Sequence, residues 1–261
     1  MLKPYYQDNT VTIYHGDSLE VLPLIGPVDC VVTDPPYGID GGRGGTSKLR
    51  GKSNYSSDFP DTPEYIKNVV VPILFEVAKW KTLAVTPGCK NICLYPPADS
   101  FGVFFSPAAS GMQRFGMADA QPILYYGWHY LQGKCPMPCS RQMIEAPEKN
   151  GHPCPKPEAA WSWLVRKCAG PGQVVLDPFL GSGTTLRICK DHGIRAIGIE
   201  IEERYCEIAA RRMAQEVLDF GGGASAPTHN TPHQARAIAS RPECSYLASS
   251  IGDNKNKFLL Q

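Results

Sequence analysis

The sequence predicts an α/β fold in which helices cover both faces of a doubly wound, mostly parallel sheet. Three observations predict it. Short apolar runs bounded by polar residues are typical of parallel strands that are buried on both faces. Segments with helical periodicity and capping residues separate these runs. Strand and helix patterns also alternate along the chain, as they do when parallel strands are joined by helical crossovers.

Length and composition favour one large domain. The chain has 261 residues, 43% of them hydrophobic, which is enough for a substantial core. The formal net charge is +1, so any surface that binds nucleic acid must be local. No run of about 18 apolar residues predicts a membrane span. Because the first residues also lack the apolar core of a signal peptide, we expect a cytoplasmic protein without a membrane partner.

The first strand is expected at residues 11–15, which end at Gly16. The helix that follows begins near Ser18, whose hydroxyl can cap it. Residues 29–33 form a continuous apolar run, as expected of a buried parallel strand. This strand stops abruptly at residues 34–37.

A glycine-rich, basic loop is expected at residues 38–60. Thr62 and Pro63 then open a helix that runs to about residue 80, with the threonine as cap and the proline at the first helical position. The next strand covers residues 82–86.

Residues 89–155 hold short apolar pieces, such as 91–95 and 122–126, separated by Pro, Gly and aromatic residues, and they predict edge strands and loops. Regular alternation returns with a helix over 157–169, whose residues Trp161, Leu164, Val165 and Cys168 share one face. Strands at 174–176 and 196–199 and helices at about 184–192 and 202–218 follow. Residues 221–261 are polar, small and unpatterned, which is typical of a tail.

The chain contains ten cysteines, scattered along it. Several lie in apolar segments and indicate buried free thiols in a reducing compartment: Cys30, Cys168, Cys189 and Cys206. One cluster is made of Cys135, Cys139, His152 and Cys154. The spacing between Cys135 and Cys139 falls within the range of structural zinc sites. Because the cluster is proline-rich and lacks a clean second pair, we expect loop thiols and no metal.

A glycine-rich turn connects the strand at 174–176 to its helix. Such a turn exposes amide donors and lets a ligand approach the backbone closely. Glu200, at the end of the next strand, can accept hydrogen bonds from a ribose diol. A dinucleotide-binding turn would have a third glycine where Leu186 stands, and a P-loop would have a lysine after the glycines. The turn therefore favours a nucleoside cofactor without a pyrophosphate, although a tight structural turn would look the same.

The tetrapeptide Asp34-Pro35-Pro36-Tyr37 stands at the carboxyl end of a buried strand, where active sites of open α/β sheets lie. The two prolines make the loop rigid and remove amide donors. The Asp34 carboxylate and the Pro35 carbonyl can then accept both hydrogens of one exocyclic amino group. Accepting them returns electron density to the nitrogen and stabilises the positive charge that develops on it as a methyl group is attacked. Tyr37 offers a flat face to a base that has left the helix stack. A proline-rich structural turn is the alternative.

These motifs resemble those of the DNA amino-methyltransferases. The tetrapeptide with Gly38 resembles the catalytic motif, and residues 177–185 resemble the cofactor motif. Further family motifs are resembled by residues 16–19, by 198–201, and by 152–153 with Lys156-Pro157. The likeness covers about residues 11–86 and 150–217. Because the catalytic motif precedes the cofactor motif, the order resembles that of the permuted, beta-type members.

The resemblance implies a seven-stranded methyltransferase sheet, S-adenosylmethionine as cofactor and double-stranded DNA as substrate. It implies catalytic roles for Asp34, Pro35, Pro36 and Tyr37. It also implies Asp17 near the adenine of the cofactor and Glu200 on its ribose. The remaining implied cofactor contacts are Lys156, Asp177, Phe179, Gly181, Ser182, Gly183 and Thr184. In the family, Asp at the first position of the tetrapeptide favours N6 of adenine as the target.

We expect one catalytic domain over residues 1–220, with a short target-recognition insertion at about 89–150, and a low-complexity tail at 221–261. The basic residues of the loop after the tetrapeptide either contact DNA phosphates or belong to a solvated linker: Arg43, Lys48, Arg50 and Lys52. Cys154 and Pro155 depart from the family pattern, which leaves the role of His152 open.

Several other activities compete with adenine methylation. N4 of cytosine suits the same acceptors, whereas a cytosine C5 enzyme needs a Pro-Cys nucleophile. Pro138-Cys139 and Pro153-Cys154 exist, but neither follows a buried strand. RNA amino-methyltransferases usually place the tetrapeptide after the glycine loop, and an inert nucleic-acid-binding module would not need both motifs. The sequence leaves open whether the enzyme accompanies a restriction enzyme or acts as a phage or orphan methylase.

Overall fold

The computed structural model describes residues 2–39, 61–106, 112–113, 116–117, 119–128, 130, 137–143 and 156–215. Met1–Val217 forms one compact unit. Four groups of predicted features lie outside the described residues: the tail at 221–261, the basic residues Arg43, Lys48, Arg50 and Lys52, most of the cysteine and histidine cluster (Cys135, His152 and Cys154), and parts of the insertion at 89–150.

The predicted α/β fold is confirmed. One sheet has the strand order β1-β2-β11-β10-β3-β4-β8-β5-β9 within the described residues. Its strands are β1 (Tyr6–Gln7), β2 (Val11–His15), β3 (Cys30–Thr33), β4 (Thr82–Val85), β5 (Ser100–Phe105), β8 (Ala120–Gly127), β9 (Arg141–Gln142), β10 (Val174–Asp177) and β11 (Arg195–Glu200). The two edge strands, β1 and β9, have two residues each and flank the seven strands that we expected. Two further short strands, β6 (Met112–Gln113) and β7 (Gly116–Met117), pair with each other.

Five neighbouring strands of the sheet run parallel. They are β2, β11, β10, β3 and β4, and each is paired with the next. Strands β8 and β5 continue the sheet in antiparallel pairing. Because the carboxyl ends of the five parallel strands lie at one edge, the loops that leave them come together there.

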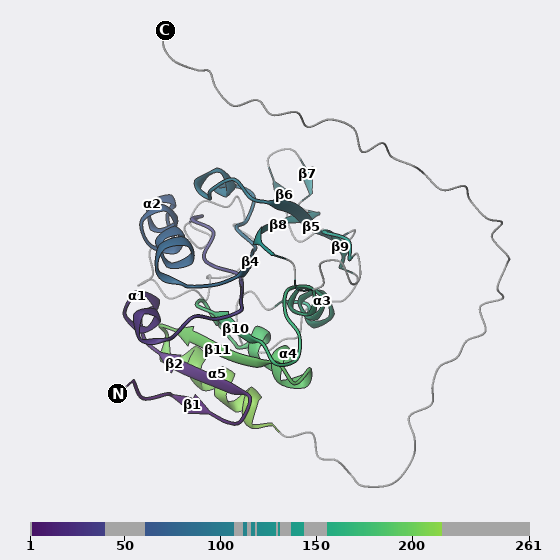
Figure 1. Ribbon diagram of the computed structural model, residues 1–261. Coiled ribbons are helices and arrows are strands. Elements are labelled where there is room, and N and C mark those ends of the chain that lie inside the picture. The colour runs from purple at the N-terminus through teal and green to yellow at the C-terminus, as the bar shows by residue number, and fades with distance from the viewer. Residues whose placement is uncertain are drawn as a thin grey trace, which may run out of the picture. The chain divides into compact units, whose positions relative to one another are not determined.

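Helices cover both faces of the sheet, as Figure 1 shows. On one face lie α3 (Glu158–Cys168), α4 (Thr184–Asp191) and α5 (Glu203–Ala214), which pack with alternate strand residues such as Cys30 and Val32. The other face carries α1 (Ser18–Val21), η1 (Leu22–Leu24), α2 (Pro63–Tyr65), and the π-helical turns η3 (Ile66–Val70) and η4 (Ile73–Val77). Val31 and Leu83 are buried on that second face. Burial on both faces explains why these strands are continuously apolar.

The helix starts were predicted with mixed success. Thr62 caps α2, accepting a hydrogen bond from the Tyr65 amide at 3.2 Å, as expected. The prediction that Ser18 caps α1 was wrong, because Asp17 is the cap and accepts from the Leu19 amide at 2.8 Å. The Ser18 hydroxyl instead donates to the Pro178 carbonyl at 2.6 Å. Because Asp17 occupies the cap position, Ser18 is the first residue of the helix, and its hydroxyl joins α1 to the loop after β10.

The middle of the chain differs most from expectation. The segment predicted as an edge strand at 122–126 is part of β8, which lies between β4 and β5 inside the sheet. Residues 91–95 hold the short 3-10 helix η5 (Ile92–Leu94) and no strand. Within β8, Ile123 and Tyr125 face α3, whereas Leu124 and Tyr126 face the opposite layer. An interior position therefore accounts for its unbroken apolar run.

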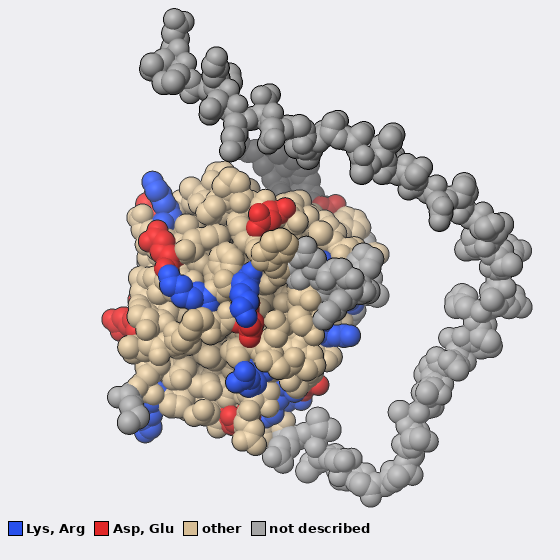
Figure 2. All heavy atoms as spheres, viewed as in Figure 1, with Lys and Arg blue, Asp and Glu red and all other residues tan. Residues whose placement is uncertain are grey.

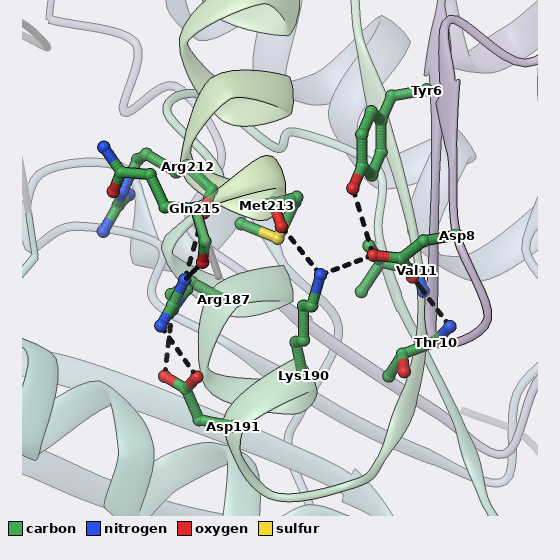
Figure 3. Close-up of polar contacts among 10 residues, drawn as sticks. All are labelled: Tyr6, Asp8, Thr10, Val11, Arg187, Lys190, Asp191, Arg212, Met213 and Gln215. Atoms are coloured by element: carbon green, nitrogen blue, oxygen red, sulfur yellow. Dashed lines mark hydrogen bonds and ion pairs between the residues drawn. The ribbon is translucent and has the colours of Figure 1, made fainter. Parts of the chain in front are cut away.

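A polar cluster ties the N-terminal hairpin to two helices (Figure 3). Lys190 of α4 forms an ion pair with Asp8 at 2.6 Å and donates to the Met213 carbonyl of α5 at 2.7 Å. Burial acts to raise the pKa of Asp8, but hydrogen bonds from Lys190, Val11 and Thr10 outweigh it and hold the pKa at about 2. The cluster therefore fixes the ends of β2, α4 and α5 relative to one another.

The cysteines expected in the core are buried and free: Cys30, Cys168, Cys189 and Cys206. Cys139 is also a free thiol, and it is half-buried. Among the described residues, no group of His, Cys, Asp or Glu side chains could hold a metal ion. No helix in the described part of the chain has the length and apolar character needed to cross a membrane.

Candidate active site

Loops from the parallel strands meet at the carboxyl edge of the sheet. Residues 34–37 follow β3, residues 86–88 follow β4, and residues 178–183 follow β10. Glu200 ends β11, and Asp17 follows β2. The strand order therefore brings the tetrapeptide next to the glycine-rich turn.

The Asp34 carboxylate is held by three donors on one of its oxygens. Oδ1 accepts from the Tyr37 hydroxyl at 2.6 Å and from Gln121 Nε2 at 3.2 Å. It also accepts a short hydrogen bond from the Thr86 hydroxyl. Gln121 Nε2 donates to the Tyr37 hydroxyl oxygen as well. Asp34 and Tyr37 are therefore joined directly and through Gln121.

The second oxygen of Asp34 faces Lys156. Its Oδ2 forms a close ion pair with Lys156 Nζ, and the two side chains are only 20% and 13% exposed. The same Nζ lies 5.7 Å from the centroid of the Tyr37 ring. The family resemblance implied that Lys156 belongs to the cofactor site. In the structure its ammonium group pairs with the Asp34 carboxylate and lies over the Tyr37 ring.

The Tyr37 ring rests on a glycine. Gly88 has a φ of +68°, and a Cβ atom on it would come within 2.8 Å of Tyr37 Cγ. The chain after Tyr37 is held by Asn91, whose Nδ2 donates to the carbonyls of Tyr37 at 2.7 Å and of Gly38 at 3.0 Å. Asp61 accepts from the Gly38 amide at 2.5 Å. The backbone that directly follows the ring is thus fixed.

The glycine-rich turn is bonded to Glu200. The Gly181 amide donates to Glu200 Oε2 at 2.8 Å, and the Glu202 amide donates to Oε1 at 2.8 Å. Gly183 precedes α4 with a φ of +83°, and a Cβ atom on it would lie 2.8 Å from Ala209 Cβ. Glycine at 183 is therefore required both by the left-handed backbone and by the close approach of α5.

Asp177 links the end of β3, which leads into the tetrapeptide, to the start of α4, which follows the glycine-rich turn. Its buried carboxylate accepts from the Thr33 hydroxyl at 2.7 Å and from the Thr185 hydroxyl at 2.6 Å. The Phe179 amide donates to it at 3.1 Å. Thr33 directly precedes Asp34, and Thr185 lies in the first turn of α4. Both oxygens of Asp177 are thus engaged by the protein itself.

Burial shifts the ionisation of both acidic groups in the turn. It raises the pKa of Asp177 to about 6, against the lowering effect of hydrogen bonds from Thr185 and Thr33. Burial likewise raises the pKa of Glu200 to about 6, opposed by the amides of Glu202 and Gly181. Both groups are therefore mostly ionised at pH 7 and become protonated in mildly acidic solution.

The other predicted cofactor residues lie in or beside the turn. Phe179 is partly buried, and the Ser182 carbonyl accepts from Arg212 at 2.8 Å. The Thr184 hydroxyl accepts from the same guanidinium at 3.3 Å. The Asp17 carboxylate caps α1. These residues come together at the strand ends as expected.

Two residues that bond to Asp34 were missed in the sequence. Thr86 follows β4, and its amide donates to the Thr33 carbonyl of the neighbouring strand at 3.2 Å. The predicted parallel pairing of β3 and β4 could have revealed it. Gln121 lies on β8, whose antiparallel place beside β4 had no signal in the sequence.

The predicted DNA contacts at Arg43, Lys48, Arg50 and Lys52 lie outside the described residues. On the face shown in Figure 2, the basic and acidic side chains of the described residues are interspersed. That mixture agrees with the small net charge of the chain.

Comparison with known proteins finds similar DNA methyltransferases. The family described as DNA methylase (N6_N4_Mtase) matches residues 120–211. The type II methyltransferase M.ScaI of Streptomyces caespitosus is 26% identical over 259 residues, which cover 82% of this chain and 84% of the relative. The family match spans the glycine-rich turn and Glu200, whereas the tetrapeptide at 34–37 lies before it.

Two solved structures share the fold. The M1.HpyAVI–SAM complex is 22% identical with a TM-score of 0.54 and covers 78% of this chain and 99% of its own. The cytosine-N4-specific PvuII DNA methyltransferase is 16% identical with a TM-score of 0.58. The match covers 83% of this chain and 90% of that protein's chain. At these identities the likeness establishes the methyltransferase fold. The sequence matches add that this chain is similar to the DNA amino-methyltransferases.

Proposed function

We propose that this protein transfers a methyl group from S-adenosylmethionine to an exocyclic amino group in double-stranded DNA, with N6 of adenine as the target. One observation carries the proposal. The acceptor-rich tetrapeptide and the glycine-rich turn follow neighbouring parallel strands, and Asp177 bonds one to the other through Thr33 at 2.7 Å and Thr185 at 2.6 Å. A methyl donor in the turn would thus lie beside an amino group held by Asp34.

The chemistry of the turn suits S-adenosylmethionine. Each Glu200 oxygen accepts one backbone amide and keeps a second lone pair, which a ribose diol could use. The proposed contacts of the cofactor are Asp17, Lys156, Asp177, Phe179, Gly181, Ser182, Gly183, Thr184 and Glu200. The similar M1.HpyAVI was solved as a complex with SAM, which supports the same assignment here. Bound in the turn, the cofactor would supply an electrophilic methyl group on a sulfonium.

The tetrapeptide would activate and orient the target amine. The Asp34 carboxylate and the Pro35 carbonyl accept its hydrogens, which makes the nitrogen lone pair available and stabilises the developing positive charge. Pro36 keeps the loop rigid, and the ring of Tyr37 stacks on the flipped base. The choice of adenine rests on the resemblance of an Asp-first tetrapeptide to adenine-specific members. We also propose that residues 1–220 form the catalytic domain and that Arg43, Lys48, Arg50 and Lys52 contact DNA phosphates.

The proposal is tested by sequencing modified bases in DNA from cells that express the protein. N6-methyladenine at a fixed sequence is expected, and it should be absent with Asp34→Ala. Calorimetry with S-adenosylhomocysteine should show that Asp34→Ala still binds the cofactor product, whereas Gly181→Trp does not. N4-methylcytosine would change the base but keep the chemistry, because the same acceptors suit either amine. Unmodified DNA from cells with folded, cofactor-binding protein would overturn the proposal.

A further inference from the structure

We infer that the ammonium group of Lys156 occupies the binding position of the target amino group, so that the base must displace it from Asp34 before methyl transfer. This inference rests on the proposed function and concerns how its active site receives the base. It follows from the way in which the two oxygens of Asp34 are used.

The first oxygen has no room for a substrate hydrogen. A carboxylate oxygen offers two lone pairs, and Oδ1 already accepts from Tyr37, Gln121 and the Thr86 hydroxyl. These three donors come from the tetrapeptide, β8 and the end of β4, so they fix the plane of the carboxylate. An amino group that binds Asp34 must therefore donate to Oδ2.

The second oxygen is taken by a group that resembles the substrate. Among the described residues, Oδ2 pairs with Lys156 Nζ, a nitrogen that donates hydrogens as an exocyclic amine does. This nitrogen lies 5.7 Å from the Tyr37 ring centroid, on the ring against which the base is proposed to stack. The ammonium group thus satisfies both the acceptor and the aromatic face that the flipped base would use.

The reaction itself favours removal of the lysine. As the new nitrogen–carbon bond forms and the methyl–sulfur bond breaks, the amine nitrogen becomes positive and then releases one proton. A second cation on the same carboxylate oxygen would repel that charge and raise the barrier. A free Oδ2 would instead stabilise that charge during transfer and then take up the proton that the nitrogen releases. The four-carbon stem of Lys156 allows its head group to swing away while Pro157 keeps the start of α3 in place.

The contact can be tested in the free protein by acylating its amines with N-hydroxysuccinimidyl acetate and measuring each lysine by mass spectrometry. Lys156 should react slowly in the wild type and at least several-fold faster in Asp34→Asn. Lys190 is a matched control, because its pair with Asp8 is remote from the tetrapeptide and its rate should not change (Figure 3). Equal Lys156 rates in the two proteins would overturn the inference without bearing on whether DNA is methylated.

Displacement is tested by binding duplex DNA that carries the methylated sequence, with S-adenosylhomocysteine saturating. One duplex contains the target base and the other an abasic site in its place, so that loss of a positive charge affects both equally. Lys156→Met should improve the affinity for the first duplex relative to the second by about three- to tenfold, as expected when a partly buried ion pair no longer competes. Lys190→Met should leave the ratio unchanged. An unaltered or reduced ratio for Lys156→Met, in an enzyme whose wild type methylates DNA, would show that the lysine does not compete with the base.

Discussion

Protonation of Glu200 should control cofactor affinity in mildly acidic solution. Its carboxylate is bonded to the amides of Gly181 and Glu202 and is proposed to accept from the ribose diol. Protonation would remove an acceptor from this arrangement. Because burial raises the pKa of Glu200 to about 6, the loss falls within an accessible pH range.

The size of the effect follows from that pKa. The ionised fraction is about one half at pH 6 and about one eleventh at pH 5, so affinity for S-adenosylhomocysteine should fall about fivefold between these two pH values. Loss of the fold should not intervene. A carboxyl group whose pKa rises on folding, here from 4.5 to about 6, contributes stability that is complete below pH 4.5 and is lost as the pH rises through 6. Acidification to pH 5 therefore favours the folded state at this group.

Calorimetric titrations from pH 5 to pH 8 would measure the effect. Wild-type affinity should decline below about pH 6, whereas Glu200→Gln should bind more weakly and show little change over the same range. Asp177 also has a pKa of about 6 and remains intact in this variant. A decline near pH 6 that persists in Glu200→Gln would refute the assignment to Glu200 and point to Asp177.

Three further substitutions test the support of the tetrapeptide and a buried hydroxyl. Gln121→Leu removes a donor shared by Asp34 and Tyr37 and should lower the single-turnover rate about tenfold or more while cofactor affinity is kept; an unchanged rate would exclude a positioning role. Gly88→Ala places a methyl group against the Tyr37 ring at a φ of +68°. It should raise the KM for DNA and cost roughly 1–2 kcal/mol of stability in urea unfolding, and a wild-type KM would contradict the contact. Tyr95→Phe removes a buried hydroxyl that lacks a hydrogen-bond partner in the described structure, so it should stabilise the protein by about 1 kcal/mol in the same assay; destabilisation would reveal a partner.

The parallel half of the sheet could be predicted because its signals are local. Each strand there is a short apolar run that ends in a polar turn, and Thr62 and Gly193 mark helix boundaries by their own chemistry. The antiparallel half could not. Strand β5 was missed and β8 was expected at an edge, because this region holds only brief apolar pieces and its antiparallel pairing has no local signal.

The candidate site divides in the same way. The tetrapeptide, the glycine-rich turn and Glu200 could be predicted, since each follows a strand whose direction the pattern indicated. The Gln121 contacts depend on the placement of β8 and could not be foreseen. The pairing of Lys156 with Asp34 joins residues more than one hundred positions apart, and no spacing in the sequence indicates it.

The buried Asp177 carboxylate has a consequence for how the two ligands influence each other. It holds Thr33, which precedes Asp34, and Thr185, which lies in the first turn of the helix after the glycine-rich turn. A ligand that shifts either threonine changes the hydrogen bond available to the other, so occupancy of one site alters the free energy of filling the second. Thermodynamic reciprocity then requires that the factor by which cofactor changes DNA affinity equals the factor by which DNA changes cofactor affinity. Loss of one threonine hydroxyl should bring both factors towards one.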